Sequence, residues 1–231
     1  MGQINSNENH FREAIINGIL KCGAVFSYKK NYKDLNYGLI IKPLNLDYNF
    51  REPIRMYFKG YPYHVGVIRN DLVYSFCPDL REPHRGTLEK DVIVENVKDW
   101  ENAEIFWFLN NPKEFTYSKI SARLIDLMLI RKGEITVEEF NFRHGTSLKM
   151  LYNLLSNNCT DTAMSVLIGK TICFQIESIA GMIKYLSGID QLLKMLPPYA
   201  KMWLADFKYI KDAGTNEETE EENNNEIKNS Y

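Results

Sequence analysis

The 231-residue sequence contains few cysteines, no long apolar run and little net charge. Its four cysteines form no C-x-x-C pair, and its four histidines are equally scattered, so we expect neither a metal site nor a cofactor. Few cysteines without a secretion signal predict free thiols in a reducing compartment, and hence a cytoplasmic location. No apolar run approaches eighteen residues, so no transmembrane helix is predicted.

The net charge is small, and it is spread unevenly along the chain. Residues 212–231 hold seven acids and one lysine, a net of −6. We expect this Asn- and Glu-rich tail, which has no apolar periodicity, to be disordered. Because the whole chain carries −2, the remaining residues carry about +4. That surplus suits an acidic membrane surface but is too small to predict a nucleic-acid partner.

The rest of the sequence has an ordinary globular composition, 45% hydrophobic and 25% charged. It is long enough for a single domain over residues 1–211. Apolar spacing predicts helices over 10–22, 118–131, 148–155, 159–168, 176–196 and 199–210, with Ser118 as an N-cap and a linker over 134–146. Apolar and β-branched runs predict strands over 37–41, 63–68, 72–76, 92–97 and 104–109. The expected fold class is α+β, with a small antiparallel sheet packed on the helix of Cys159 and further helices flanking it.

The stretch of residues 152–161, YNLLSNNCTD, reads as a loop that leads directly into a helix. Asn158 is a suitable N-cap, and the acidic Asp161 in the first turn suits the helix dipole. Cys159 would then be the first helical residue, where unpaired backbone N–H groups favour a thiolate and can hold an oxyanion. Asn157 and Asn158 are further oxyanion or positioning candidates. The alternative is an inert, buried core cysteine.

Residues 63–76, YHVGVIRNDLVYSF, read as a β-hairpin with its turn at residues 69–71. His64 lies early on the first strand and is the candidate base for Cys159. Ser75, near the end of the second strand, or its neighbour Tyr74 could orient the imidazole. The alternative is a half-buried strand histidine without chemistry. His144, which precedes Gly145, is the rival base.

The order of these two motifs resembles the circularly permuted branch of the papain-like NlpC superfamily. That branch includes the lecithin–retinol acyltransferase-like enzymes and the PPPDE-type isopeptidases. The resemblance covers residues 56–169 and implies a papain-like permuted core, followed by a helical extension over residues 174–210. It also implies that His64 is the base and Cys159 the nucleophile. The acyltransferase pattern has a histidine where this sequence has Ser75, and the turn is about one residue shorter here.

The resemblance implies a cysteine-dependent hydrolase or acyltransferase that acts on an amide, isopeptide or acyl-ester bond. The reaction would pass through an acyl-enzyme on Cys159. Protein, peptide or lipid acyl groups are the expected substrates. The alternative function is a catalytically inactive binding or adaptor module on the same scaffold, which the missing third histidine would favour.

The sequence begins MGQINS, which fits the pattern for N-myristoylation of Gly2. We therefore expect lipidation if the protein is made in, or delivered into, a eukaryotic cytosol, for example as an effector in a host cell. One myristoyl chain binds a membrane only weakly, so a second signal is needed. The basic residues Lys29, Lys30 and Lys33 could supply it.

Overall fold

The computed structural model describes residues 10–28, 36–44, 63–77, 86–110, 115–152 and 157–175. Contacts divide the chain into Met1–Tyr185 and Leu186–Tyr231, and every described residue belongs to the first of these units. The predicted helices over 176–196 and 199–210, the acidic tail and Gly2 lie outside the described residues. None of the described helices is long and apolar enough to cross a membrane.

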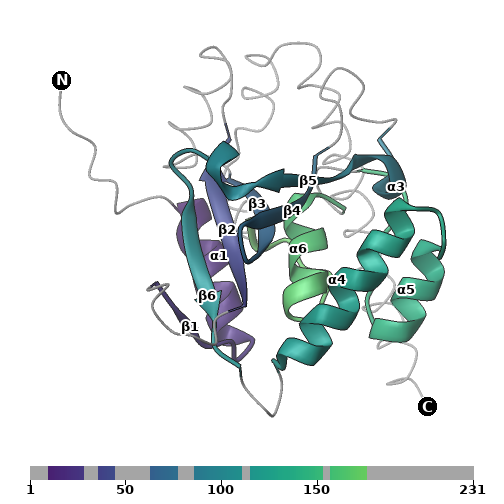
Figure 1. Ribbon diagram of the computed structural model, residues 1–231. Coiled ribbons are helices and arrows are strands. Elements are labelled where there is room, and N and C mark those ends of the chain that lie inside the picture. Colours follow the sequence, from purple (N-terminus) through teal and green to yellow (C-terminus); the bar gives the residue numbers. More distant parts are fainter. Residues whose placement is uncertain are drawn as a thin grey trace, which may run out of the picture. The chain divides into compact units, whose positions relative to one another are not determined.

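Six antiparallel strands form one sheet in the order β1-β6-β2-β3-β4-β5 (Figure 1). The strands are β1 Phe26–Ser27, β2 Tyr37–Pro43, β3 Tyr63–Arg69, β4 Leu72–Phe76, β5 Val92–Asn96 and β6 Glu104–Phe108. The predicted hairpin is confirmed as β3 and β4, and Asn70 in its turn has a positive φ of 55°. Asparagine tolerates that left-handed conformation better than most residues. The α+β class with a small antiparallel sheet is therefore confirmed.

One face of the sheet, here called the helical face, carries the long helices. They are α1 His10–Lys21, α4 Tyr117–Arg131 and α6 Cys159–Leu167. Arg12 of α1 lies over the ring of Phe106, and Tyr117 of α4 lies against Tyr37 with 5.6 Å between ring centroids. α6 lies beside α4, where the Nη1 of Arg123 donates to the carbonyl of Val166 at 2.7 Å (Figure 1).

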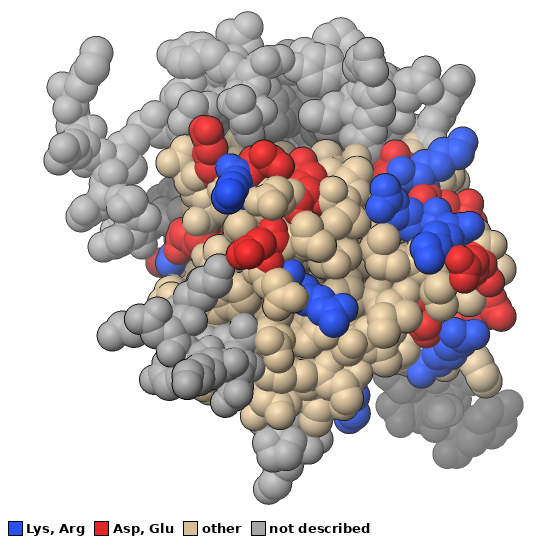
Figure 2. All heavy atoms as spheres, in the orientation of Figure 1, with Lys and Arg blue, Asp and Glu red and all other residues tan. Residues whose placement is uncertain are grey.

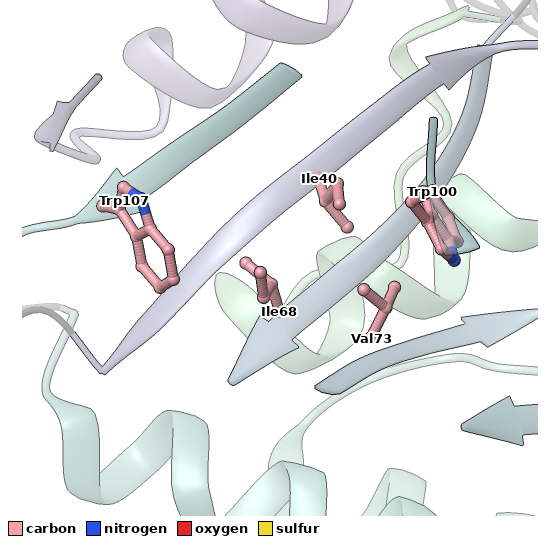
Figure 3. Close-up of a cluster of buried hydrophobic side chains, with 5 residues drawn as sticks. All are labelled: Ile40, Ile68, Val73, Trp100 and Trp107. Atoms are coloured by element: carbon pink, nitrogen blue, oxygen red, sulfur yellow. The ribbon is translucent and has the colours of Figure 1, made fainter. Parts of the chain in front are cut away.

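The opposite face, here called the tryptophan face, is covered by a short 3-10 helix, η1 Val97–Asp99, and the residues after it. Successive side chains of a strand point to opposite faces of the sheet. The residue before or after one that faces the helices therefore points to the tryptophan face. The buried cluster on this face contains Ile40, Ile68, Val73, Trp100 and Trp107 (Figure 3). Both faces of β3 are therefore covered, and six of its seven residues are buried.

Two sequence predictions of helical structure are wrong in detail. α4 begins one residue early, and its N-cap is Thr116 rather than Ser118, because the Thr116 hydroxyl accepts from the N–H of Lys119. The predicted linker over 134–146 contains α5 Val137–His144, which a capping box between Thr136 and Glu139 begins and Gly145 ends. Two further short elements, β1 and α3 Leu88–Asp91, also have no counterpart among the predictions.

The predicted helix over 148–155 is wrong for its described part. Residues 148–152 contain no helix, and Leu151 instead forms an antiparallel bridge with Thr87. The backbone N–H of Leu88 bonds the carbonyl of Met150, and that of Tyr152 bonds the carbonyl of Gly86. These contacts with a distant segment hold the backbone extended just before the start of α6.

Candidate thiol site at the start of α6

The first turn of α6 is closed by a capping box, in which the predicted N-cap Asn158 pairs with Asp161. The Oδ1 of Asn158 accepts from the N–H groups of Thr160 at 2.8 Å and Asp161 at 3.4 Å. In return, the Asp161 carboxylate accepts from the N–H of Asn158 at 3.0 Å. All nine residues of α6 are buried. Cys159 is therefore the first residue of a rigidly capped, fully buried helix.

Replacing Asn158 by alanine should lower the free energy of unfolding by about 1 kcal/mol, the usual cost of a lost N-cap. Urea unfolding measures it. Asn158→Ser is the matched control, because serine supplies a capping oxygen and, like alanine, lacks the amide that donates to the Sγ of Cys173 at 3.2 Å. Equal losses in the two variants would contradict the capping role.

Asn157 fixes the chain before the helix rather than facing the thiol. Its Nδ2 donates to the carbonyls of Lys149 at 2.6 Å and Leu151 at 2.7 Å, and its Oδ1 accepts from the N–H of Lys149 at 3.3 Å. The side chain of Asn157 is thus engaged by Lys149 and Leu151, and that of Asn158 by the first turn of α6 and by Cys173. In this structure both residues position Cys159.

The thiol of Cys159 lies against the edge of β3. Its hydrogen-bond partners are the backbone of Val65 and the side chain of Thr160, and both lower its pKa. Burial has the larger effect and raises the pKa of Cys159 to about 11. At neutral pH the group is therefore a protonated thiol. Nearby Tyr152 has its pKa raised well above 10 by burial and by the charges of Cys159, Cys77 and Cys173, so its phenol also keeps its proton.

His64 lies beside Val65 in sequence but on the tryptophan face. It pairs with Lys42 across β2 and β3, and its imidazole stacks on Trp100 with 5.0 Å between ring centroids. The Nζ of Lys42 lies 4.4 Å from the same indole. Burial, and then the positive charge of Lys42, lower the pKa of His64 to about 4. The imidazole is therefore neutral at pH 7, and α6 lies on the other face of the sheet.

The two residues considered for orienting His64 lie on different faces of β4. Ser75 pairs with Gly66, so it shares the tryptophan face with His64, and its buried Oγ has no hydrogen-bond partner among the described residues. Tyr74 pairs with Val67 and points to the helical face. Of the two, only Ser75 is placed where it could approach the imidazole.

The rival base, His144, is occupied at the contact between α4 and α5. Its Nε2 lies 2.9 Å from the Oδ2 of Asp126, and its ring lies against Phe140 with 4.8 Å between centroids. Arg143 reaches the same carboxylate oxygen at 3.3 Å. This arrangement joins two helices and gives His144 a structural explanation that needs no reaction.

Sequence reasoning gave no role to Val65, Thr160 or Gln175, although Val65 directly follows His64 and Thr160 directly follows Cys159. Gln175 bonds to Tyr63, 112 positions away, so no local pattern could reveal it. Among the described residues no group of three or more His, Cys, Asp or Glu side chains could hold a metal ion. The four cysteines are all free thiols.

No protein-family model matches the chain, and comparisons with curated proteins and with solved structures find no match either.

Proposed function

We propose that the protein is a cysteine-dependent hydrolase or acyltransferase with Cys159 as its nucleophile and a permuted papain-like core. The observation that carries the proposal is the position of Cys159 as the first residue of a capped, buried helix, where the backbone of Val65 and the hydroxyl of Thr160 lower the pKa of its thiol. Groups placed in this way stabilise a thiolate and, as the acyl group reacts, an oxyanion.

In the proposed reaction the two partners start neutral. The Cys159 thiol has a pKa of about 11 and His64 one of about 4, so a resting thiolate–imidazolium pair is disfavoured. Attack would therefore be assisted by a general base: the S–H proton passes to the imidazole as sulfur bonds to the substrate carbonyl carbon. The imidazolium then protonates the departing amine or alcohol. Water, or a second nucleophile, cleaves the thioester and restores the thiol.

This reaction requires the imidazole of His64 to leave Trp100 and reach the thiol. Such a movement would have to break the pairing of His64 with Lys42 of β2, because the start of β3 is paired with β2 although not with β4. His64 is the natural candidate because it directly precedes Val65, whose backbone already bonds the sulfur. Substrate binding would have to stabilise the rearranged state over the stacked one.

The proposed substrate carries an amide, an isopeptide or an acyl-ester bond, and the acyl group that the site accepts decides which. Figure 2 shows acidic and basic side chains interspersed over the visible face, with a broad uncharged area between them. The proposed action at a membrane surface therefore depends on Gly2 and the basic residues 29, 30 and 33. All of them lie outside the described residues.

The test is to trap the acyl-enzyme. The protein is mixed with p-nitrophenyl acetate, p-nitrophenyl decanoate or a peptide p-nitroanilide and quenched in acid, and its peptides are analysed by mass spectrometry. We expect an acyl adduct on Cys159 that is absent in Cys159→Ser and forms more slowly in His64→Gln. A preference for the decanoyl ester would indicate lipid acyl transfer. An adduct confined to other cysteines, or none at all, would contradict the proposed activity.

The second candidate function is a binding module without catalysis. The stacking of His64 on Trp100 favours it, because a histidine held there is a poor base for Cys159. The same trapping experiment separates the two functions: a module would acylate Cys159 no faster in the wild type than in His64→Gln.

A further inference from the structure

At residues 63–65, β3 extends beyond its pairing with β4. The pairing of β3 with β4 runs from Gly66 and Ser75 to Arg69 and Leu72 and does not reach Val65. Along a strand, the N–H groups of residues two apart point the same way. The N–H groups of Tyr63 and Val65 therefore lie on one edge, and each needs a partner other than β4.

Two side chains take the place of the missing strand along this edge. Gln175 bonds both backbone groups of Tyr63: its Oε1 accepts from the N–H at 2.7 Å, and its Nε2 donates to the carbonyl at 2.9 Å. Cys159 bonds the next position, at Val65. Gln175 is itself buried, with 6% of its surface exposed.

The side-chain amide of Gln175 makes a third hydrogen bond, which links the start of β3 to the first turn of α6. Its Nε2 also donates to the Oγ1 of Thr160 at 2.8 Å. The orientation of the amide is fixed, because the N–H of Tyr63 requires the oxygen on its side. A hydroxyl oxygen that accepts from Gln175 keeps its own hydrogen to donate, and the Thr160 hydroxyl is one of the groups that lower the pKa of the adjacent Cys159.

We propose that Gln175 and Thr160 are positioning residues that direct the Thr160 hydroxyl onto the sulfur of Cys159 and hold the start of β3 beside it. The inference rests on the proposed function, whose nucleophile it concerns. Gln175 controls both donors to the sulfur: it orients Thr160 directly and fixes the backbone two residues before Val65. Gln175 and Thr160 thus determine how readily Cys159 loses its proton. A glutamine with a purely structural role would not affect that proton.

The chain offers a closely matched control. Thr162 lies on the same helix, is as fully buried as Thr160, and its Oγ1 has no hydrogen-bond partner among the described residues. Thr160→Val and Thr162→Val therefore make the same isosteric change on the same helix. Only the first removes a hydrogen bond to the thiol, so a difference between the two variants reports that bond.

The experiment measures the alkylation rate of Cys159 by iodoacetamide between pH 7 and pH 11, using peptide mass spectrometry. We expect Thr160→Val to react about tenfold more slowly than wild type at pH 8, because a donor to the charged form is lost. The difference should shrink toward pH 11. Thr160→Ser should restore the wild-type profile, Thr162→Val should match it, and Gln175→Leu should be slowed in the same pH-dependent way.

Equal profiles for the two Thr→Val variants, or no rescue by Thr160→Ser, would overturn the inference. A variant that merely loosens the fold would react faster at every pH, which also counts against it. If Gln175→Leu does not fold, the comparison of Thr160→Val with Thr162→Val still decides the role of the hydroxyl. Alkylation needs no substrate, so this result stands apart from the acyl-enzyme test: either inference can fail while the other holds.

Discussion

Cys159 should be alkylated about 100-fold more slowly at pH 7 in the native protein than in the urea-unfolded chain. Only the thiolate reacts, and burial raises the pKa of Cys159 from 9.0 to about 11, which lowers the thiolate fraction by about two powers of ten. The native rate should then increase about tenfold per pH unit between pH 7 and pH 10. Iodoacetamide labelling followed by peptide mass spectrometry measures both rates for the same residue.

Cys22 provides the internal comparison, because it is a half-buried free thiol in α1's C-terminal turn and is sampled in the same digest. The sequence hypothesis of a preformed thiolate–imidazolium pair predicts the opposite result, fast labelling of Cys159 even at pH 6. That outcome would mean that the imidazole reaches the sulfur in solution without substrate. Slow labelling would mean that the resting site is neutral and that catalysis depends on a rearrangement of His64.

The elements that local sequence chemistry determines were predicted well. The cap of α6 depends on Asn158 and Asp161, three residues apart, and their side chains bond each other's backbone as that spacing predicts. The hairpin of β3 and β4 depends on two β-rich runs around Asn70. In both cases the residues that decide the structure are neighbours in the sequence.

Helix α5 was not predicted, because its sequence gives almost no periodic apolar pattern. Its capping box, Thr136 with Glu139, was present in the sequence, but the helix has only eight residues, and Val137 and Phe140 are its only buried ones. Phe142 on the same helix is 91% exposed, which disrupts the apolar pattern that would mark a helix face. Short elements with one apolar turn do not give a periodic signal.

The side of the sheet taken by His64 could not be read from the sequence. In a strand with one solvent-exposed face, polar residues show which side is exposed. Both faces of β3 are buried, so its sequence does not show which side chains face the helices. Trp100, on which the imidazole stacks, lies 36 positions further along the chain and is brought there only by the sheet. The bonds of Gln175 to Tyr63 are equally non-local. Tertiary contacts of this kind decide the geometry of the candidate site.

His64 should make the native protein lose about 3 kcal/mol of stability between pH 7 and pH 4. Its pKa is lowered from 6.5 to about 4 by burial and by Lys42, so the unfolded chain takes up a proton in this range before the folded one does. The stabilisation is complete above pH 6.5 and is lost as the pH falls toward 4. Urea unfolding of wild type and His64→Phe at pH 7, 5.5 and 4 measures the difference, since phenylalanine can stack on Trp100 without titrating.

The sign of this dependence also distinguishes the two states of the site. A histidine paired with the Cys159 thiolate would have a raised pKa, so its contribution would persist in acid and disappear as the pH rises. A wild type that loses no more stability in acid than His64→Phe would therefore contradict the stacked, neutral imidazole. It would favour a histidine that already faces the thiol. A loss of the expected size would instead place the activating step after substrate binding, at the start of β3 that Gln175 holds.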